Sequence, residues 1–110
     1  MAGESYTPDR GHLVWLDFDP RTGSEQSGHR PALVLSPTLY NQHGKMICCP
    51  VTTQARPWPF LVALTGGDKE SFAIADQIRC VDWRARSAAF IRRVEPDVVN
   101  KVRGLARSLI

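Results

Sequence analysis

The 110-residue chain has no long apolar segment, because its longest apolar runs are about five residues. A bilayer-spanning helix needs roughly 20 apolar residues, so no membrane association is expected. The first twelve residues also lack the basic and apolar regions of a secretory signal peptide. We therefore expect one cytoplasmic domain over residues 1–110, with residues 1–10 flexible, since a chain of this size buries one core.

Cysteine and histidine are scarce as well, with three residues of each. The cysteines form an odd set, and Cys48 and Cys49 are neighbours whose side chains point to opposite faces of a strand. A disulfide framework is therefore not expected, in keeping with reduced thiols in the cytoplasm. The histidines show no metal-site spacing and no acidic cluster suits Mg²⁺, so we expect no metal and no other cofactor.

Negative charge becomes scarce toward the C-terminus. The formal net charge is +3, but residues 1–78 hold six Lys and Arg against eight Asp and Glu, a balance of −2. Residues 79–110 hold eight against three, a balance of +5. A basic C-terminal third favours an acidic or polyanionic partner. A solvated, arginine-rich surface is the alternative.

Short apolar segments, in contrast, are abundant, and their spacing predicts strands over residues 12–18, 31–36, 45–51, 60–65, 71–75, 77–81 and 87–94. Ser36 is expected to cap a short helix that begins at Pro37. Glu95, Pro96 and Asp97 predict the first turn of a C-terminal amphipathic helix. Its apolar face comprises Val98, Val99, Val102, Leu105, Ala106 and Leu109. The predicted fold is a mostly β, small barrel of five to seven strands, closed by this helix.

A polar segment, residues 20–31, joins the first two predicted strands and is longer than such a connection requires. It carries an acid, an imidazole and an arginine beside two glycines. The arginine, Arg30, stands at the start of the next strand. Its guanidinium could pair with Asp17 or Asp19, or it could clamp a phosphate through two parallel hydrogen bonds.

Two more polar groups stand beside predicted strands. The third strand ends in two threonines and a glutamine, namely Thr52, Thr53 and Gln54. Threonines at strand ends are common strand formers, so these become functional candidates only if they converge with Arg30. Asp76 and Gln77 adjoin another apolar strand and interrupt its polarity pattern.

In this order the motifs resemble those of the MazF (PemK-like) toxins, over about residues 11–109. They are GHLVWLDFDPRTGSEQSGHRPALVLSP, CPVTTQ, WPFLVAL and ADQIRCVDWRAR, followed by the C-terminal helix. The resemblance implies an SH3-like barrel of the CcdB, Kid and MazF type that forms a homodimer. It also implies a toxin that cuts single-stranded RNA, such as mRNA, at short sequences without a metal. The implied partner is a MazE-like antitoxin that lays a flexible acidic segment along the dimer.

The resemblance also implies roles for individual residues. Arg30 and Thr52 correspond to the catalytic pair, and Glu25 to a further position that matters for activity. The Kid branch instead uses an arginine two residues before the aspartate of its DQ motif. Ile74 occupies that place here, two residues before Asp76, which favours a site of the MazF type.

The implied reaction is attack of the RNA 2′-hydroxyl on the adjacent phosphate. Arg30 would stabilise charge on the phosphoryl oxygens, and Thr52 would add a hydrogen bond to them. We prefer Glu25 to His29 as the base, because the His29 side chain should point away from that of Arg30 on an extended backbone.

Contacts with single-stranded RNA are expected from aromatic stacking and from hydrogen bonds to base edges. Core packing is the alternative for each aromatic residue, and it is the preferred interpretation for Trp15 and Trp83. The stacking candidates are Trp15, Phe18 and Trp58, and the further contact candidates are His29, Thr53, Gln54, Asp76 and Gln77.

Two other functions remain open from the sequence. A non-enzymatic toxin of the CcdB type shares the barrel and poisons DNA gyrase through its C-terminal helix, and it would need neither Arg30 nor Thr52. A plain SH3-like interaction module would use the long polar segment only as a recognition loop.

Overall fold

The computed structural model describes residues 6–17 and 29–110. These residues form seven strands and two helices, and each predicted strand is present within about two residues of its predicted ends. In chain order the elements are β1 (His12–Asp17), β2 (His29–Val34), α1 (Thr38–Asn41), β3 (Lys45–Thr52), β4 (Leu61–Leu64), β5 (Ser71–Ile74), β6 (Arg79–Asp82), β7 (Ala89–Arg93) and α2 (Pro96–Arg107). The predicted mostly β fold with a C-terminal helix is confirmed.

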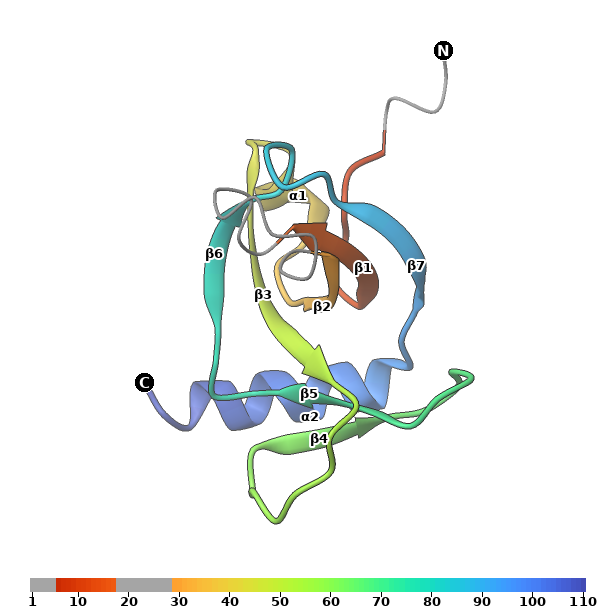
Figure 1. Ribbon diagram of the computed structural model, residues 1–110. Coiled ribbons are helices and arrows are strands. Elements are labelled where there is room, and N and C mark those ends of the chain that lie inside the picture. The colour runs from red at the N-terminus through yellow and green to blue at the C-terminus, as the bar shows by residue number, and fades with distance from the viewer. Residues whose placement is uncertain (1–5, 18–28) are drawn as a thin grey trace.

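The strands pair in the order β4-β5-β3-β2-β1-β7, all antiparallel, and β6 pairs with β3 as well. The sheet curls around β1 and β2, and α2 packs beside β4 across the open end of the curl (Figure 1). Strand β3 contacts three other strands. Its first half pairs with β6, its middle with β2 and its end with β5.

The curled sheet separates two apolar cores, and Cys48 and Cys49 of β3 lie in different ones. The core inside the curl contains Val14, Leu16, Ala32, Val34, Met46, Cys48, Val81 and Trp83. The core beneath α2 includes Leu13, Leu33, Cys49, Val51, Val62, Ala73, Val99 and Val102. The prediction of free cysteines is confirmed, and burial raises the pKa of both buried thiols to about 12.

Helix α2 begins and packs as its sequence predicts. Pro96 occupies its first turn, Asp97 adds negative charge there, and Val99, Val102 and Ala106 are buried. Leu109 was predicted on the same apolar face but is 52% exposed, because the helix ends at Arg107 and Leu109 lies beyond its last turn. Neither helix of the described residues combines the length and the apolar character needed to cross a bilayer.

Ser36 does not cap α1, contrary to the sequence prediction. Pro37 is the cap residue, and no side-chain hydrogen bond caps this end. The Ser36 hydroxyl instead donates to Asn41 Oδ1 (2.6 Å) and accepts the backbone N–H of Ile47 (2.8 Å). Asn41 is fully buried, and its Nδ2 donates to the carbonyls of Pro8 and Ser36. Ser36 therefore joins α1 to β3 in a buried polar network.

Residues 6–10, part of the segment expected to be flexible, pack against the rest of the described chain. Pro8 is fully buried, and the carboxylate of Asp9 accepts the backbone N–H of Thr38 (2.9 Å). The Arg10 Nε donates to the carbonyl of Leu35 (2.8 Å). Residues 1–5 lie outside the described residues.

His12, at the start of β1, is buried as a neutral side chain. Its Nδ1 accepts the backbone N–H of Asp9 (3.2 Å), so the Tyr6 hydroxyl 2.8 Å away donates to the same nitrogen. The proton then sits on Nε2, which is buried and has no hydrogen-bond partner among the described residues. Burial, and secondarily the nearby Arg93, lower the pKa of His12 below its usual 6.5, against an opposing effect of Asp9.

We predict that His12 makes the protein less stable in mild acid. Below pH 6.5 the unfolded chain binds a proton at His12 that the folded chain does not, so the free energy of unfolding falls as the pH drops through this range. Urea unfolding at pH 7.5 and 5.5 measures the loss. The variant His12→Gln keeps an acceptor for the Tyr6 hydroxyl but does not titrate, so its free energy of unfolding should fall less between these two pH values. An equal loss in both proteins would contradict this account.

Candidate functional site

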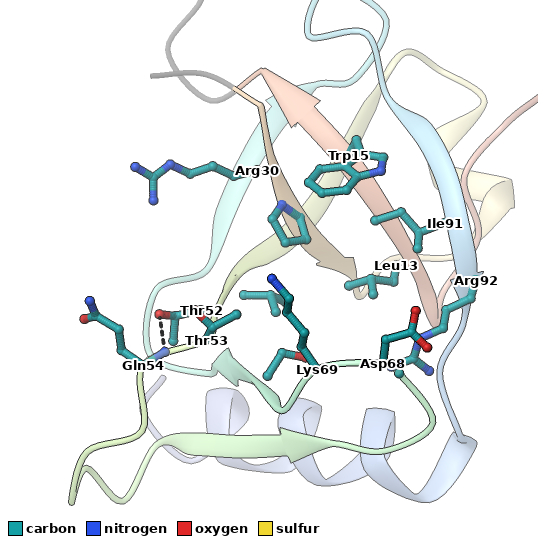
Figure 2. Close-up of a pocket in the computed structure, with 14 residues that line it drawn as sticks. Leu13, Trp15, Arg30, Thr52, Thr53, Gln54, Asp68, Lys69, Ile91 and Arg92 are labelled. Atoms are coloured by element: carbon teal, nitrogen blue, oxygen red, sulfur yellow. Dashed lines mark hydrogen bonds between the residues drawn. The ribbon is translucent and has the colours of Figure 1, made fainter. Parts of the chain in front are cut away.

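A cavity of about 540 Å³ opens on the surface where β1, β2, the end of β3, the β4–β5 hairpin and β7 meet. Five residues singled out from the sequence line it, namely Trp15, Arg30, Thr52, Thr53 and Gln54. Figure 2 shows Arg30, Thr52 and Gln54 on one side of the cavity, Asp68 and Arg92 on the other, and Lys69 between them. The structure thus brings Arg30 and the threonine pair into one cavity, the condition under which these residues become functional candidates.

Arg30 is held at the start of β2, where it pairs in register with Leu16 of β1. None of the described residues forms a hydrogen bond or ion pair with its guanidinium. Its proposed pairing with Asp17 does not occur, because Asp17 Oδ1 lies 2.9 Å from Nδ1 of His29. Asp19, the other suggested partner, lies outside the described residues. Within the part of the chain that the structure describes, the exposed guanidinium is thus unpaired.

His29 and Arg30 lie on opposite faces of the sheet, as the extended backbone predicts. The register places His29 opposite Asp17 and Arg30 opposite Leu16, and directly paired residues share a face. The His29 ring stacks on the indole of Trp15, with ring centres 5.4 Å apart and planes 6° from parallel. His29 therefore adjoins the cavity through Trp15 without standing beside Arg30.

Trp15 is 40% exposed, so the preferred prediction that it packs in the core is wrong. Its neighbours Val14 and Leu16 occupy the inward positions of β1 and are fully buried, which leaves Trp15 on the outer face. The same prediction is confirmed for Trp83, which is 5% exposed and donates its indole N–H to the carbonyl of Asn41 (2.7 Å).

Thr52 ends β3 and has its hydroxyl oriented by the following turn. The backbone N–H of Gln54 donates to Thr52 Oγ1 (3.1 Å). A hydroxyl has two acceptor sites and one proton, so Thr52 retains its own O–H for donation to a ligand oxygen.

The remaining candidates lie away from this cavity. Trp58 donates its indole N–H to Asp76 Oδ1 (3.2 Å), which joins the loop before β4 to the turn after β5. Gln77 is exposed in that turn, and its backbone N–H donates to the carbonyl of Ile74 (3.1 Å). Ile74 itself is 8% exposed. Phe18 and Glu25 lie outside the described residues.

Sequence reasoning missed three charged residues of the cavity: Asp68, Lys69 and Arg92. The first two stand in a segment interpreted only as a turn, and Arg92 in a strand of ambiguous pattern. No local signal pointed to Arg92, because a bulge between β1 and β7 breaks the alternation of β7 and pairs Leu13 with Arg92 but Val14 with Phe90. The charges of the cavity lining are thus three cations and one carboxylate.

Metal ligands do not gather in the part of the chain that the structure describes. Among residues 6–17 and 29–110, no group of three or more His, Cys, Asp or Glu side chains is placed to hold a metal ion.

Residues 9–110 match the family model of the PemK-like, MazF-like toxins of type II toxin–antitoxin systems. The chain belongs to this family. It is 46% identical over 106 residues to the endoribonuclease toxin MazF of Escherichia coli K12, with 96% of each chain covered.

Solved structures agree with this assignment. MazF from Deinococcus radiodurans superposes with a TM-score of 0.85 at 48% identity, covering 96% of this chain and 97% of that one. A MazE–MazF complex from the same organism gives a TM-score of 0.83 at 44% identity, with 96% of both chains covered. The solved structures of these relatives therefore confirm the barrel predicted for a MazF-like chain.

The three tryptophans of this MazF-like chain should give three distinguishable indole N–H signals in NMR spectra. Replacing Asp76 by Ala removes the acceptor of Trp58, so we expect only the Trp58 signal to shift. The Trp83 signal should exchange slowly with solvent, because its N–H is buried and bonded to Asn41. A ¹⁵N spectrum of wild type and Asp76→Ala measures both, and a shift shared by all three signals would refute the local contact.

Proposed function

We propose that this protein is the endoribonuclease toxin of a type II toxin–antitoxin pair and cleaves single-stranded RNA, such as mRNA, in the cytoplasm. The convergence of Arg30 and Thr52 in one cationic cavity carries the proposal. Membership of the family and the names of the related endoribonuclease toxins support it. These relatives favour RNA cleavage over gyrase poisoning or a plain interaction module.

The proposed reaction is metal-independent phosphodiester cleavage by the RNA itself. The 2′-oxygen attacks the adjacent phosphorus, the bond to the 5′-oxygen breaks, and a 2′,3′-cyclic phosphate and a 5′-hydroxyl result. One proton leaves the 2′-hydroxyl and one arrives at the 5′-oxygen. Glu25 is the proposed acceptor of the first proton, in preference to His29.

Arg30 and Thr52 stabilise the charge that develops on the phosphoryl oxygens. The guanidinium supplies two parallel N–H donors, and no described residue competes for them. Thr52 adds a neutral O–H donor whose oxygen is already fixed by Gln54. Donors aimed at developing charge before the reaction begins are often the largest single contribution to catalysis.

The RNA strand is proposed to follow the same surface. The exposed indole of Trp15, already stacked on His29, offers a face for a base at the wall of the cavity that Arg30 also lines. Thr53 and Gln54 supply hydrogen-bonding groups at the cavity wall. Phe18, Trp58, Asp76 and Gln77 are proposed as outer contacts. Trp58, 42% exposed and held by Asp76, is the second stacking surface.

The proposed protein partner is a MazE-like antitoxin with an acidic segment. The cavity lining has three cationic side chains against one carboxylate, which suits an acidic peptide as well as RNA. The solved complex of the Deinococcus radiodurans relative with MazE supports the same class of partner.

The activity test uses a long RNA transcript in the presence of EDTA. Wild type should cut it at mapped positions, and Arg30→Ala should leave no detectable product while remaining folded by circular dichroism. Thr52→Val should lower kcat by roughly 10²–10³, the usual cost of one such donor. Leu39→Ala, on the exposed surface of α1, is the control and should cut at the wild-type rate. A folded Arg30→Ala protein with full activity would overturn the site, and an inactive wild type would overturn the function.

We propose a homodimer as the assembled state. A second cavity, of about 410 Å³, lies between α1, β3 and the end of α2, and part of its lining is exposed and apolar, comprising Tyr40, Ile47, Ile78 and Ile110. Exposed apolar patches of this kind mark protein–protein contacts. A second copy of the chain is the proposed occupant.

Light scattering coupled to size exclusion tests the dimer. Wild type should have twice the mass of one chain, and Ile78→Lys should shift it toward the monomer by placing a charge in the apolar surface. Leu39→Lys adds the same charge to an exposed residue that does not line the cavity and should not change the mass. A monomeric wild type would contradict the dimer.

A further inference from the structure

Two cations, Lys69 and Arg92, line the cavity together with Arg30 and Thr52 but come from different elements. Lys69 belongs to the turn between β4 and β5, and Arg92 to β7. In Figure 2, Arg92 lies across the cavity from Arg30. The cavity therefore has a second cationic region, separate from the one proposed to hold the scissile phosphate.

The Arg92 guanidinium is seated against the β4–β5 turn, which contains two consecutive glycines. A Cβ atom added to Gly66 would lie 3.2 Å from Arg92 Nη1, and one added to Gly67 would lie 3.2 Å from Nη2. Both distances are shorter than ordinary contacts, so the turn accommodates the guanidinium because it has no side chains there. Gly66 also has φ +90°, a backbone conformation that other residues resist. The turn and the arginine thus fit each other.

No described residue pairs with either cation. The side chains of Lys69 and Arg92 form no hydrogen bond or ion pair with another described residue, although Asp68 lines the same region. Arg92 is only half-exposed, so its charge is partly removed from water, and Asp68 is the one carboxylate among the described residues of the cavity lining. With two cations and one carboxylate, this region carries a net positive charge that an anionic ligand would balance.

We propose that Lys69 and Arg92 form a second phosphate subsite, which binds one non-scissile phosphate of the RNA strand whose cleaved phosphate lies at Arg30 and Thr52. This inference rests on the proposed endoribonuclease function. Arg92 supplies a planar pair of donors for two phosphate oxygens, and Lys69 adds a mobile point charge. Phosphate contacts fix the register of a nucleic acid without reading its sequence. The subsite positions the strand and takes no part in bond making or breaking.

The first experiment measures the salt dependence of binding. A fluorescein-labelled 12-nucleotide single-stranded DNA is the probe, because it lacks the 2′-hydroxyl and stays intact; it carries the mapped cut sequence, or a fixed mixed sequence if wild type cuts no RNA. Each single-strand phosphate contact contributes about 0.7 to the slope of log Kd against log salt. The double variant Lys69→Gln/Arg92→Gln should lose about 0.7 of that slope and bind roughly tenfold more weakly in low salt. Lys101→Gln, on the exposed face of α2, is the matched charge control and should keep the wild-type slope.

The second experiment identifies the phosphate. Neutral methylphosphonate replaces each phosphate of the probe in turn, and binding is measured for wild type and for Arg92→Gln. One non-scissile position should weaken binding to wild type and have little effect in Arg92→Gln, because the variant has already lost that contact. If Arg92→Gln does not fold, Lys69→Gln replaces it, since Lys69 is exposed in a turn.

Cleavage kinetics separate this inference from the function on which it rests. Lys69→Gln and Arg92→Gln should raise KM roughly tenfold with kcat near that of wild type, the pattern of lost uniform binding. If wild type cleaves RNA and both variants keep the wild-type KM, salt slope and methylphosphonate profile, the subsite is wrong and the endoribonuclease function stands. If wild type cuts no RNA but one methylphosphonate position still weakens its binding to the probe, the proposed endoribonuclease function is wrong and the phosphate subsite stands. A protein that neither binds nor cuts would overturn both.

Discussion

The burial of β3 on both faces is the constraint on which the rest of the structure depends. Its neighbours Cys48 and Cys49 are fully buried in different cores, and the strand pairs with β2, β5 and β6 along its length. Because pairing and packing specify the register on both faces, a slip by one residue would misplace both cores at once. The position of Thr52, at the end of this strand, is therefore set by a backbone that three other strands hold in register.

The cavity takes its geometry from that constraint. Arg30 is fixed through β2, which pairs with β3 on one side and β1 on the other. The β4–β5 hairpin attaches to the end of β3 and carries Lys69, while β7 brings Arg92 from the other edge of the sheet. Cationic donors held on paired strands need little rearrangement when a phosphate arrives, which is the condition for electrostatic catalysis.

The sequence predicted what depends on local pattern and missed what depends on distant contacts. The strand positions follow from the alternation of apolar residues, and the start of α2 follows from Pro96 and Asp97. Both signals act within a few residues of the chain. Trp15 was misjudged because β1 is apolar on both faces, and only packing decides which face is covered. Ser36 bonds Asn41 and Ile47, whose proximity is a tertiary property. Lys69 and Arg92 meet Arg30 only through strand pairing, and no spacing along the chain encodes that meeting.

The two buried cysteines allow unfolding of the protein to be followed by thiol labelling. Alkylating reagents react with thiolates, and a pKa of about 12 leaves Cys48 and Cys49 almost entirely protonated as well as inaccessible. Cys80 is exposed on β6. Folded molecules should therefore take up one label and unfolded molecules three, with no engineered probe. Because the buried pair straddles the sheet, opening of either core alone would add a single label and show which core opened first.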